Sequence, residues 1–305
     1  MRIDRHTSGV YVIAATPFSA DGAIDWPSLD RLIDFYAAAG VDGITALGIM
    51  GEADKLTPEE RRAVLARILG RTRLPVVVGV SDSGLDNLRD FARHAMDTGC
   101  AGVMVAPARG TPREDRVLGY FHQVCEALGP DVPVVYQDFP QTTGVPISTR
   151  GILELTRDLP QIVMLKHEDS PGLAKISALR AAEEKGAPRL SILCGNGGIH
   201  LPQELMRGAD GAMTGFAYPE ALVHTVRLHA EGRDDAAEDL FDCYLPILRL
   251  EQQLVAGLAI RKQILMRRGV LASAALRAPG PKLSPIDVVE IDRLMARTER
   301  KLKDL

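Results

Sequence analysis

The chain has 305 residues, of which 46% are hydrophobic and 25% charged, and its formal net charge is −4. This composition is typical of a globular protein with a large core, and it lacks the basic excess of proteins that bind nucleic acid or anionic membranes. The four cysteines lie far apart, which argues against a zinc site or a disulfide framework and fits a reducing cytosol. No stretch approaches the roughly 18 consecutive apolar residues of a membrane span, so we expect a cytoplasmic protein without membrane contact.

Apolar runs alternate with helical segments along most of the chain. Strands are expected at residues 10–17, 43–47, 75–80, 102–107, 133–138, 161–166, 191–195 and 211–215. Helices are expected at residues 25–40, 57–69, 87–98, 114–128, from 148 onward, and 172–184. Asp25 and Thr57 are good helix caps, and Gly40 and Gly99 are suited to ending helices.

These units predict an α/β fold, a (β/α)8 TIM barrel with a C-terminal helical extension. Continuous Val, Ile and Leu strands between helices indicate a parallel sheet covered by helices, and eight such units fit a closed barrel. The main alternative, a doubly wound open sheet, normally carries a G-x-G-x-x-G motif after an early strand, and none is found there. We expect the barrel to occupy residues 1–220 and the extension, packed on the barrel, residues 221–305.

One lysine closes an apolar run. Lys166 ends the expected sixth strand, and alternation puts it on the same face as Ile162 and Met164. If that face is the closed interior, the amine is desolvated, and a neutral amine can form a Schiff base with a carbonyl. The alternative is an ordinary lysine that reaches solvent from the strand end.

In a (β/α)8 barrel, functional residues lie at the carboxyl ends of the strands. This rule selects Thr16, residues 48–52, Ser81, Asp82 and residues 107–110, 136–138, 166–169, 195–198 and 214–215. Tyr136 shares a face with Val134, so we expect the neighbouring fifth and sixth strands to direct a phenol and an amine into one cavity. The alternative is a core tyrosine with a structural hydroxyl.

Together these residues resemble the dihydrodipicolinate synthase and N-acetylneuraminate lyase family of Schiff-base aldolases. The similarity runs from Gly9 through the C-terminal helices, and its most specific parts are Gly48-Ile-Met-Gly-Glu52, Tyr136 and Lys166. The resemblance implies that Lys166 forms the Schiff base and that Tyr136 shuttles protons. It also implies a set of residues around the keto acid: Gly48, Ile49, Met50, Gly51, Met213 and Thr214.

The departures from the family pattern bear on the substrate. Ile49 and Met50 stand where two hydroxyl residues are usual, so backbone N–H groups must bind the carboxylate. The synthase branch has a tyrosine after strand four, where this chain has residues 108–110, and an arginine where residues 141–144 have none; Arg109 is another possible source of a cation. Residues 230–235, 245–249 and 259–262 are similar to the branch that dehydrates 2-keto-3-deoxy sugar acids.

Other candidate residues have two readings each. The glycines of residues 195–198 fit either a phosphate site or a tight turn. His167 points away from Lys166 by alternation, which favours a structural role, whereas Glu168 and Asp169 are either loop carboxylates or an acid or base near the substrate. No histidines or carboxylates have metal-ligand spacing, so we predict no metal and no cofactor.

The resulting prediction is a lyase that forms a Schiff base with a small-molecule 2-keto acid, acting as a dehydratase or aldolase of the 2-keto-3-deoxy sugar acid type. The alternatives are 4-hydroxy-tetrahydrodipicolinate synthase, a phosphate-binding barrel enzyme without covalent chemistry, and a non-catalytic ligand-binding barrel. The resemblance also implies a homo-oligomer, either a tetramer or a dimer.

Overall fold

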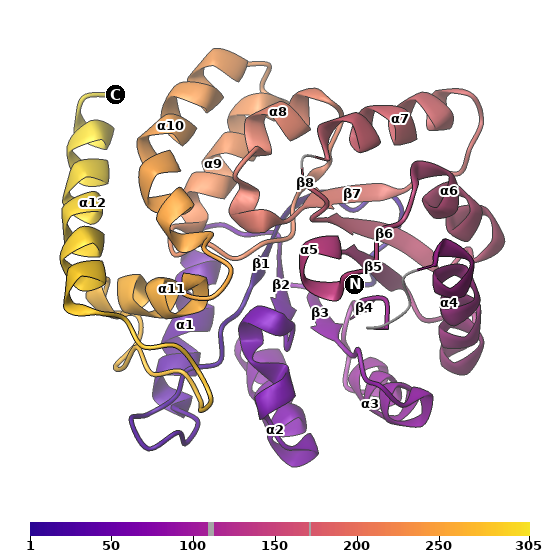
Figure 1. The fold of residues 1–305 in the computed structure, drawn as a ribbon, viewed down its shortest axis with the longest axis horizontal. Helices are drawn as coiled ribbons and strands as arrows, with labels where there is room; N and C mark the ends of the chain where they lie inside the picture. Colours follow the sequence, from indigo (N-terminus) through magenta and orange to yellow (C-terminus); the bar gives the residue numbers. More distant parts are fainter. Residues whose placement is uncertain (109–112, 171) are drawn as a thin grey trace.

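Eight parallel strands close into a barrel in sequence order, so the predicted (β/α)8 fold is confirmed (Figure 1). The computed structural model describes residues 1–108, 113–170 and 172–305. The strands are β1 (Gly9–Ile13), β2 (Gly43–Ala46), β3 (Val76–Gly79), β4 (Gly102–Val105), β5 (Val134–Asp138), β6 (Ile162–His167), β7 (Ser191–Cys194) and β8 (Gly211–Ala212). Most are shorter than the apolar runs that predicted them.

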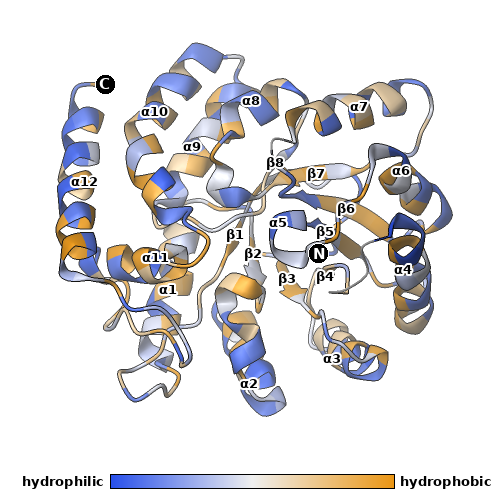
Figure 2. Cartoon of the chain, in the orientation of Figure 1, coloured by the Kyte–Doolittle hydropathy of each residue, from blue (hydrophilic) through white to orange (hydrophobic). Residues whose placement is uncertain are grey.

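Helices surround the barrel (Figure 1). They are α1 (Trp26–Ala38), α2 (Pro58–Arg71), α3 (Leu85–Asp97), α4 (Glu114–Leu128), α5 (Pro140–Thr143), α6 (Thr149–Asp158), α7 (Leu173–Glu184), α8 (Leu201–Met206) and α9 (Pro219–Ala230). The caps predicted at Asp25 and Thr57 form: each side chain accepts a hydrogen bond from a backbone N–H in the first turn, and Thr57 is part of a capping box with Glu60. Figure 2 shows mainly hydrophobic strands and helices with hydrophilic outer faces.

Three helices follow the barrel: α10 (Asp234–Glu251), α11 (Gly257–Arg267) and α12 (Pro285–Lys303). Helix α9 packs against β1 and α8 and therefore closes the ring of barrel helices. The boundary expected at residue 220 was thus too early, because it assigned this helix to the extension. The extension begins with α10, which packs on α9 and α12.

The core has an inner and an outer layer. The outer layer includes side chains from both strands and helices, whereas the inner layer consists almost entirely of strand residues and fills the barrel. The inner layer contains Tyr11, Val77, Met104, Val135, Met164, Leu193 and Met213. Gly43 makes room for Tyr11, because a Cβ at this glycine would lie 2.3 Å from Cε1 of the ring. The barrel interior is therefore a packed core below its mouth.

Two buried cations of α11 join the extension to the mouth of the barrel. Lys262 donates to Glu52 Oε1 at 2.6 Å and to the backbone oxygen of Thr16 at 2.7 Å. Arg261 pairs with Glu251 of α10 at 2.5 Å and donates to the backbone oxygen of Gly215 after β8. The extension thus neutralises Glu52 in the loop after β2 and supplies hydrogen bonds to the loops after β1 and β8.

Candidate active site

Lys166 points into the barrel from the end of β6. In the strand register it lies beside Gln137 on β5 and Leu193 on β7, and Leu193 belongs to the inner layer of the core. The lysine is only 3% exposed, so it is buried as predicted and does not extend into solvent. Its Nζ forms an ion pair with the Glu168 carboxylate, which is also buried. A desolvated amine therefore lies next to a group that can accept its proton.

Glu168 reaches Lys166 because the adjoining strand ends in a glycine. A Cβ at Gly195 would lie 2.0 Å from Cγ of Glu168, so only glycine leaves room for this side chain. From the other side, Gln137 Nε2 donates to Glu168 Oε1 at 3.4 Å. The three inward side chains of Lys166, Glu168 and Gln137 form a connected polar group at the top of the inner core.

Tyr136 is not part of this group, and the prediction that it shares a cavity with Lys166 is wrong. Tyr136 pairs in register with Leu165, and both side chains belong to the outer layer of the core. Its ring packs against Phe121 of α4, with centroids 4.7 Å apart. Tyr136 does share a face with Val134, but that face points toward the helices. Gln137 occupies the position opposite Lys166 instead.

An irregularity in β6 explains a second difference. Val134 pairs with Ile162, but the next residue, Val135, pairs with Met164, so β6 carries one extra residue at this point. A bulge of this kind shifts the alternation of side chains. Ile162 consequently lies in the outer layer while Met164 and Lys166 point inward, and the three do not share one face as predicted.

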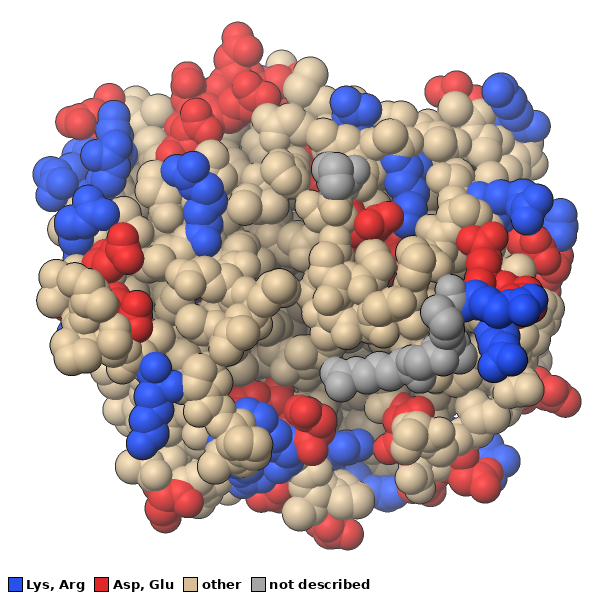
Figure 3. Space-filling model, in the orientation of Figure 1, with Lys and Arg blue, Asp and Glu red and all other residues tan. Residues whose placement is uncertain are grey.

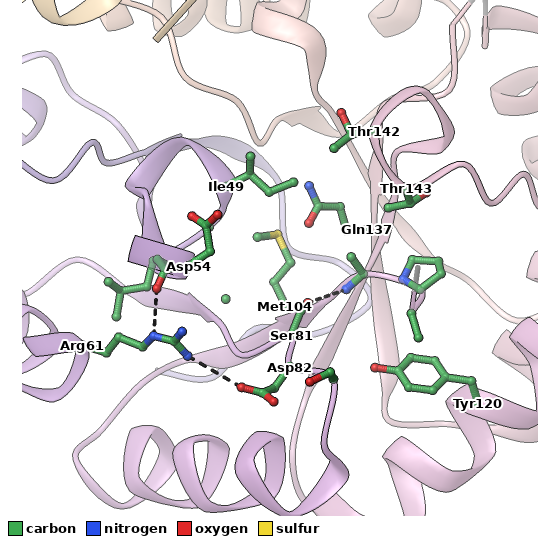
Figure 4. A pocket seen from close by; sticks show the side chains of 18 residues that line it. Ile49, Asp54, Arg61, Ser81, Asp82, Met104, Tyr120, Gln137, Thr142 and Thr143 are labelled. Atoms are coloured by element: carbon green, nitrogen blue, oxygen red, sulfur yellow. Dashed lines mark hydrogen bonds and ion pairs between the residues drawn. The ribbon is translucent and has the colours of Figure 1, made fainter. Parts of the chain in front are cut away.

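A cavity of about 430 Å³ opens over the carboxyl ends of β2 to β5 (Figure 4). Gly48, Ile49, Met104 and Gln137 line the part nearest the barrel interior, and Thr142 and Thr143 of α5 line its rim. Lys166 itself lies behind Gln137 and does not line this cavity. In Figure 3 charged side chains gather toward the margin of this face, around a mostly uncharged and hollowed centre. The polar group of Lys166, Glu168 and Gln137 therefore adjoins an open, ligand-sized space.

The predicted carboxylate loop forms a 3₁₀ turn, Ile49–Gly51. Gly48 and Ile49 line the cavity, whereas Met50 and Gly51 do not. The oxygen of Gly51 accepts a hydrogen bond from the Thr16 hydroxyl at 2.6 Å. The backbone of Glu52 is in the left-handed region, with φ of 53°, and its side chain is buried against Lys262. The loop is thus held rigidly by groups behind it.

Met213 and Thr214, which were predicted to lie around the keto acid, contact other parts of the protein instead. Met213 belongs to the inner core, and the Thr214 hydroxyl accepts a hydrogen bond from the Gly197 backbone N–H at 2.6 Å. Neither residue lines the cavity. A Cβ at Gly197 would lie 2.2 Å from Gln252 Nε2, so close packing accounts for this glycine as it does for Gly195. The glycines of residues 195–198 therefore fit the tight-turn reading.

Behind β6 lies a second set of titratable groups, in the outer layer. His167 points away from Lys166, as predicted, and its Nε2 lies 3.1 Å from the oxygen of Gly172. Asp169 pairs with Lys175 at 2.7 Å, so Glu168 is the only one of the two loop carboxylates that contacts Lys166. Burial raises the pKa of Glu204 to about 7, and the nearby His167 partly opposes that rise.

Arg61 and Tyr120 are among the cavity residues that the strand-end rule missed. They reach the cavity from helices α2 and α4, so their positions could not be read from strand ends. Asp82, which the rule did select, lines the cavity with them. Arg109 lies outside the described residues.

Within residues 1–108, 113–170 and 172–305, no group of three or more His, Cys, Asp or Glu residues has the arrangement of a metal site. No helix in the same ranges is long and apolar enough to cross a membrane.

Comparisons with known proteins bear on the family and the fold. The sequence model of the Dihydrodipicolinate synthetase family matches residues 6–295. The chain is 28% identical over 300 residues to L-2-keto-3-deoxyarabonate dehydratase of Azospirillum brasilense, covering 95% of this chain and 94% of that protein. It is 28% identical over 304 residues to 4-hydroxy-tetrahydrodipicolinate synthase of Porphyromonas gingivalis, covering 96% and 98%. A crystal structure of dihydrodipicolinate synthase from Rhodopseudomonas palustris superposes with a TM-score of 0.96 at 46% identity, covering 97% and 99%.

Proposed function

The chain belongs to the dihydrodipicolinate synthetase family and is a lyase, and from this premise we propose that Lys166 forms a Schiff base with a 2-keto acid. The observation that carries the proposal is the buried amine of Lys166, directed into the barrel beside the Glu168 carboxylate. A lysine amine that has lost its proton is a nucleophile toward a carbonyl, and the Glu168 carboxylate that contacts Lys166 is a proton acceptor.

The chemistry follows from the electron demand of an iminium. The Lys166 amine attacks the C2 carbonyl of the substrate, and loss of water from the carbinolamine gives the iminium. Removal of a proton from C3 then gives an enamine, which expels the C4 hydroxyl as water in a dehydration. Hydrolysis of the remaining iminium releases the product and restores the lysine. No step requires a metal or a redox cofactor.

Proton transfer is assigned to Glu168. Its carboxylate contacts the inward-pointing Lys166, whereas Tyr136 belongs to the outer layer, next to the helices. A positioned acid or base contributes about 10²- to 10⁴-fold to a rate. Gln137 cannot exchange protons, but its amide, 3.4 Å from Glu168, orients the carboxylate. In this chain Glu168 therefore carries out the proton transfer that the family resemblance gives to Tyr136.

The substrate carboxylate is proposed to bind at the start of the 3₁₀ turn. The backbone N–H groups of Ile49 and Met50 form no hydrogen bond with the described residues, so they are available as donors. Ile49 and Gln137 lie near one another at one end of the cavity (Figure 4), which puts this turn close to the polar group around Lys166. Backbone donors suit a carboxylate without any side-chain hydroxyl.

The rim of the cavity favours a 2-keto-3-deoxy sugar acid over the synthase reaction. Condensation with aspartate semialdehyde needs a grip on a second carboxylate, and a bidentate arginine supplies this best. Here the rim carries Thr142, whose hydroxyl suits a hydroxylated chain, and Thr143, whose hydroxyl already donates to the Phe139 backbone oxygen. The 4-hydroxy-tetrahydrodipicolinate synthase reaction is the second candidate, favoured by the 46% identity to the Rhodopseudomonas palustris structure.

Borohydride trapping tests the covalent step. Purified protein incubated with pyruvate and borohydride should gain one reduced adduct, which peptide mass spectrometry should locate at Lys166. Lys166→Ala should abolish the adduct, whereas Lys185→Ala, which changes an exposed lysine, should leave it unchanged. No adduct across a panel of keto acids, or an adduct retained in Lys166→Ala, contradicts the proposal. A substrate panel then separates sugar-acid dehydration from condensation with aspartate semialdehyde.

A homo-oligomer is proposed as the assembled form. Ile286 and Val289 lie one turn apart on α12 and are 69% and 60% exposed, which leaves an apolar strip for a symmetric contact. Light scattering at micromolar concentration should give a dimer or tetramer, and a purely monomeric protein would contradict this.

A further inference from the structure

We propose that Asp82 and Tyr120, together with Arg61, form a subsite that binds an uncharged, hydroxylated chain end and rejects a terminal carboxylate. This inference rests on the proposed function and deepens it: the enzyme should prefer a 2-keto-3-deoxy aldonate to the matching aldarate. The subsite lies at the end of the cavity away from Ile49 and Gln137 (Figure 4).

Arg61 is the cation of this subsite, and its charge is already engaged. Its Nε donates to the oxygen of Ala53 at 2.9 Å, and its Nη1 lies 3.9 Å from Asp82 Oδ2. These two contacts fix the guanidinium across the cavity wall. An incoming carboxylate would have to compete with the fixed Asp82 carboxylate for the same cation.

Asp82 offers one oxygen to the cavity. Its Oδ1 accepts from the Gly84 backbone N–H at 3.0 Å and from Asn87 Nδ2 at 3.2 Å, which anchors the loop before α3. Among the described residues, its Oδ2 has Arg61 as its partner, at 3.9 Å, a distance that leaves the oxygen able to accept from a hydroxyl donor. An ionised carboxylate accepts hydrogen bonds but donates none, so it selects for hydroxyl groups and against a second carboxylate.

The balance of charge points the same way. Among the described residues that line the cavity, the charged ones are Arg61, Asp54 and Asp82. Counted over these described residues alone, two carboxylates accompany one guanidinium. A substrate with a terminal carboxylate would be repelled there, and repulsion between like charges is strong in a partly desolvated cavity.

Tyr120 supplies the complementary donor. Figure 4 shows its hydroxyl directed toward the side of the cavity where Asp82 lies. Burial and the neighbouring Asp82 raise the pKa of Tyr120 to about 12, so the phenol stays protonated at neutral pH. No hydrogen bond to its hydroxyl is found among the described residues, which leaves both the proton and the lone pairs for a ligand. A sugar-type hydroxyl could donate to Asp82 and accept from Tyr120.

The test compares two six-carbon substrates that differ only at the far end: a 2-keto-3-deoxy aldonate with a terminal CH2OH and the aldarate with a carboxylate there. Wild type should prefer the aldonate in kcat/KM. Asp82→Asn should lower kcat/KM for the aldonate by about 10- to 100-fold, the range for a hydrogen bond to a charged group, and should shift the preference toward the aldarate. Asp86→Asn is the matched control, because Asp86 carries the same group in an exposed position on α3.

Tyr120→Phe provides a second, gentler variant. It should lower kcat/KM for the aldonate by about 3- to 10-fold and leave the rate of pyruvate trapping at Lys166 unchanged. Equal losses on both substrates, or a matching loss in pyruvate trapping, would overturn the subsite. If wild-type protein forms no adduct with pyruvate, the proposed function fails. If the adduct forms normally but neither variant changes the aldonate-to-aldarate ratio, only the subsite inference fails.

Discussion

Replacing Tyr136 by phenylalanine should leave catalysis nearly intact, although the family resemblance gives this tyrosine a central role. The substitution removes one hydroxyl and keeps the ring that packs against Phe121. Tyr136 is 2% exposed, its hydroxyl forms no hydrogen bond with the described residues, and it belongs to the outer layer while Lys166 points inward. Burial raises its pKa well above the ordinary value, and the nearby Asp138 adds to the rise, so the phenol is poorly suited to releasing a proton.

The magnitudes follow from this environment. Leaving a buried hydroxyl without a partner costs about 1–3 kcal/mol, so Tyr136→Phe should keep the free energy of unfolding unchanged or raise it by up to that amount. Loss of a positioned proton-transfer group instead lowers kcat by about 10²- to 10⁴-fold. We expect that loss for Glu168→Gln, which keeps the size of the side chain but removes its carboxylate.

The assay measures kcat on a 2-keto-3-deoxy aldonate, the rate of pyruvate trapping and the urea midpoint for both variants beside wild type. Similar urea midpoints would confine any difference to the chemistry. A loss of 10²-fold or more in Tyr136→Phe, with Glu168→Gln near wild type, would refute the assignment of proton transfer to Glu168 and the strand register on which it depends.

Three further variants test the surroundings of the site. Lys262→Met should lower the free energy of unfolding by about 3–5 kcal/mol in urea titrations, because it leaves Glu52 buried without its cation; a change of under about 1 kcal/mol would show that the pair is not needed. Gly195→Ala should displace Glu168 and lower kcat while the circular dichroism spectrum stays native, since the new Cβ would lie 2.0 Å from Glu168 Cγ. Full activity in this variant would show that the reaction does not need Glu168. Burial holds the pKa of Glu204 at about 7, above its ordinary 4.5, so the folded state retains this proton longer than the unfolded chain and stability should fall as pH rises from about 4.5 to 7. Glu204→Gln should remove about 3 kcal/mol of that fall, measured as urea midpoints across the range, and an unchanged slope would contradict the shift.

The sequence predicted the barrel well because its signals are local and repeated. Apolar runs mark the strands, and caps such as Thr57 mark where helices begin. It also predicted the burial of Lys166, because a cation closing an apolar run has few explanations. The face of Tyr136 was harder to predict, because in a parallel barrel both faces of a strand are apolar and alternation alone does not tell inside from outside. The extra residue in β6 then changes the parity without any sign in the composition.

The cavity beyond Lys166 was only partly predictable. Asp82 follows a strand and was selected by the strand-end rule, but Arg61 and Tyr120 come from helices, where a charged or aromatic residue usually faces solvent or the core. Lys262 had no local signal either, since a lysine on a helix is normally exposed and here it is fully buried. The surroundings of such residues depend on contacts between segments that lie far apart in the sequence.

Such a distant contact has a consequence for how the protein matures. Glu52 and Lys262 are separated by 210 positions, so the acid leaves the ribosome long before the base that neutralises it. At about 5–20 residues per second, translation of the intervening chain takes on the order of 10–40 s. Throughout that interval the loop carrying Gly48 and Ile49 lacks its rear support, although β3 to β8 are all made before it ends. A nascent or truncated chain that ends before α11 would therefore hold Lys166 but no ordered carboxylate loop, and activity would appear only when the last helices dock.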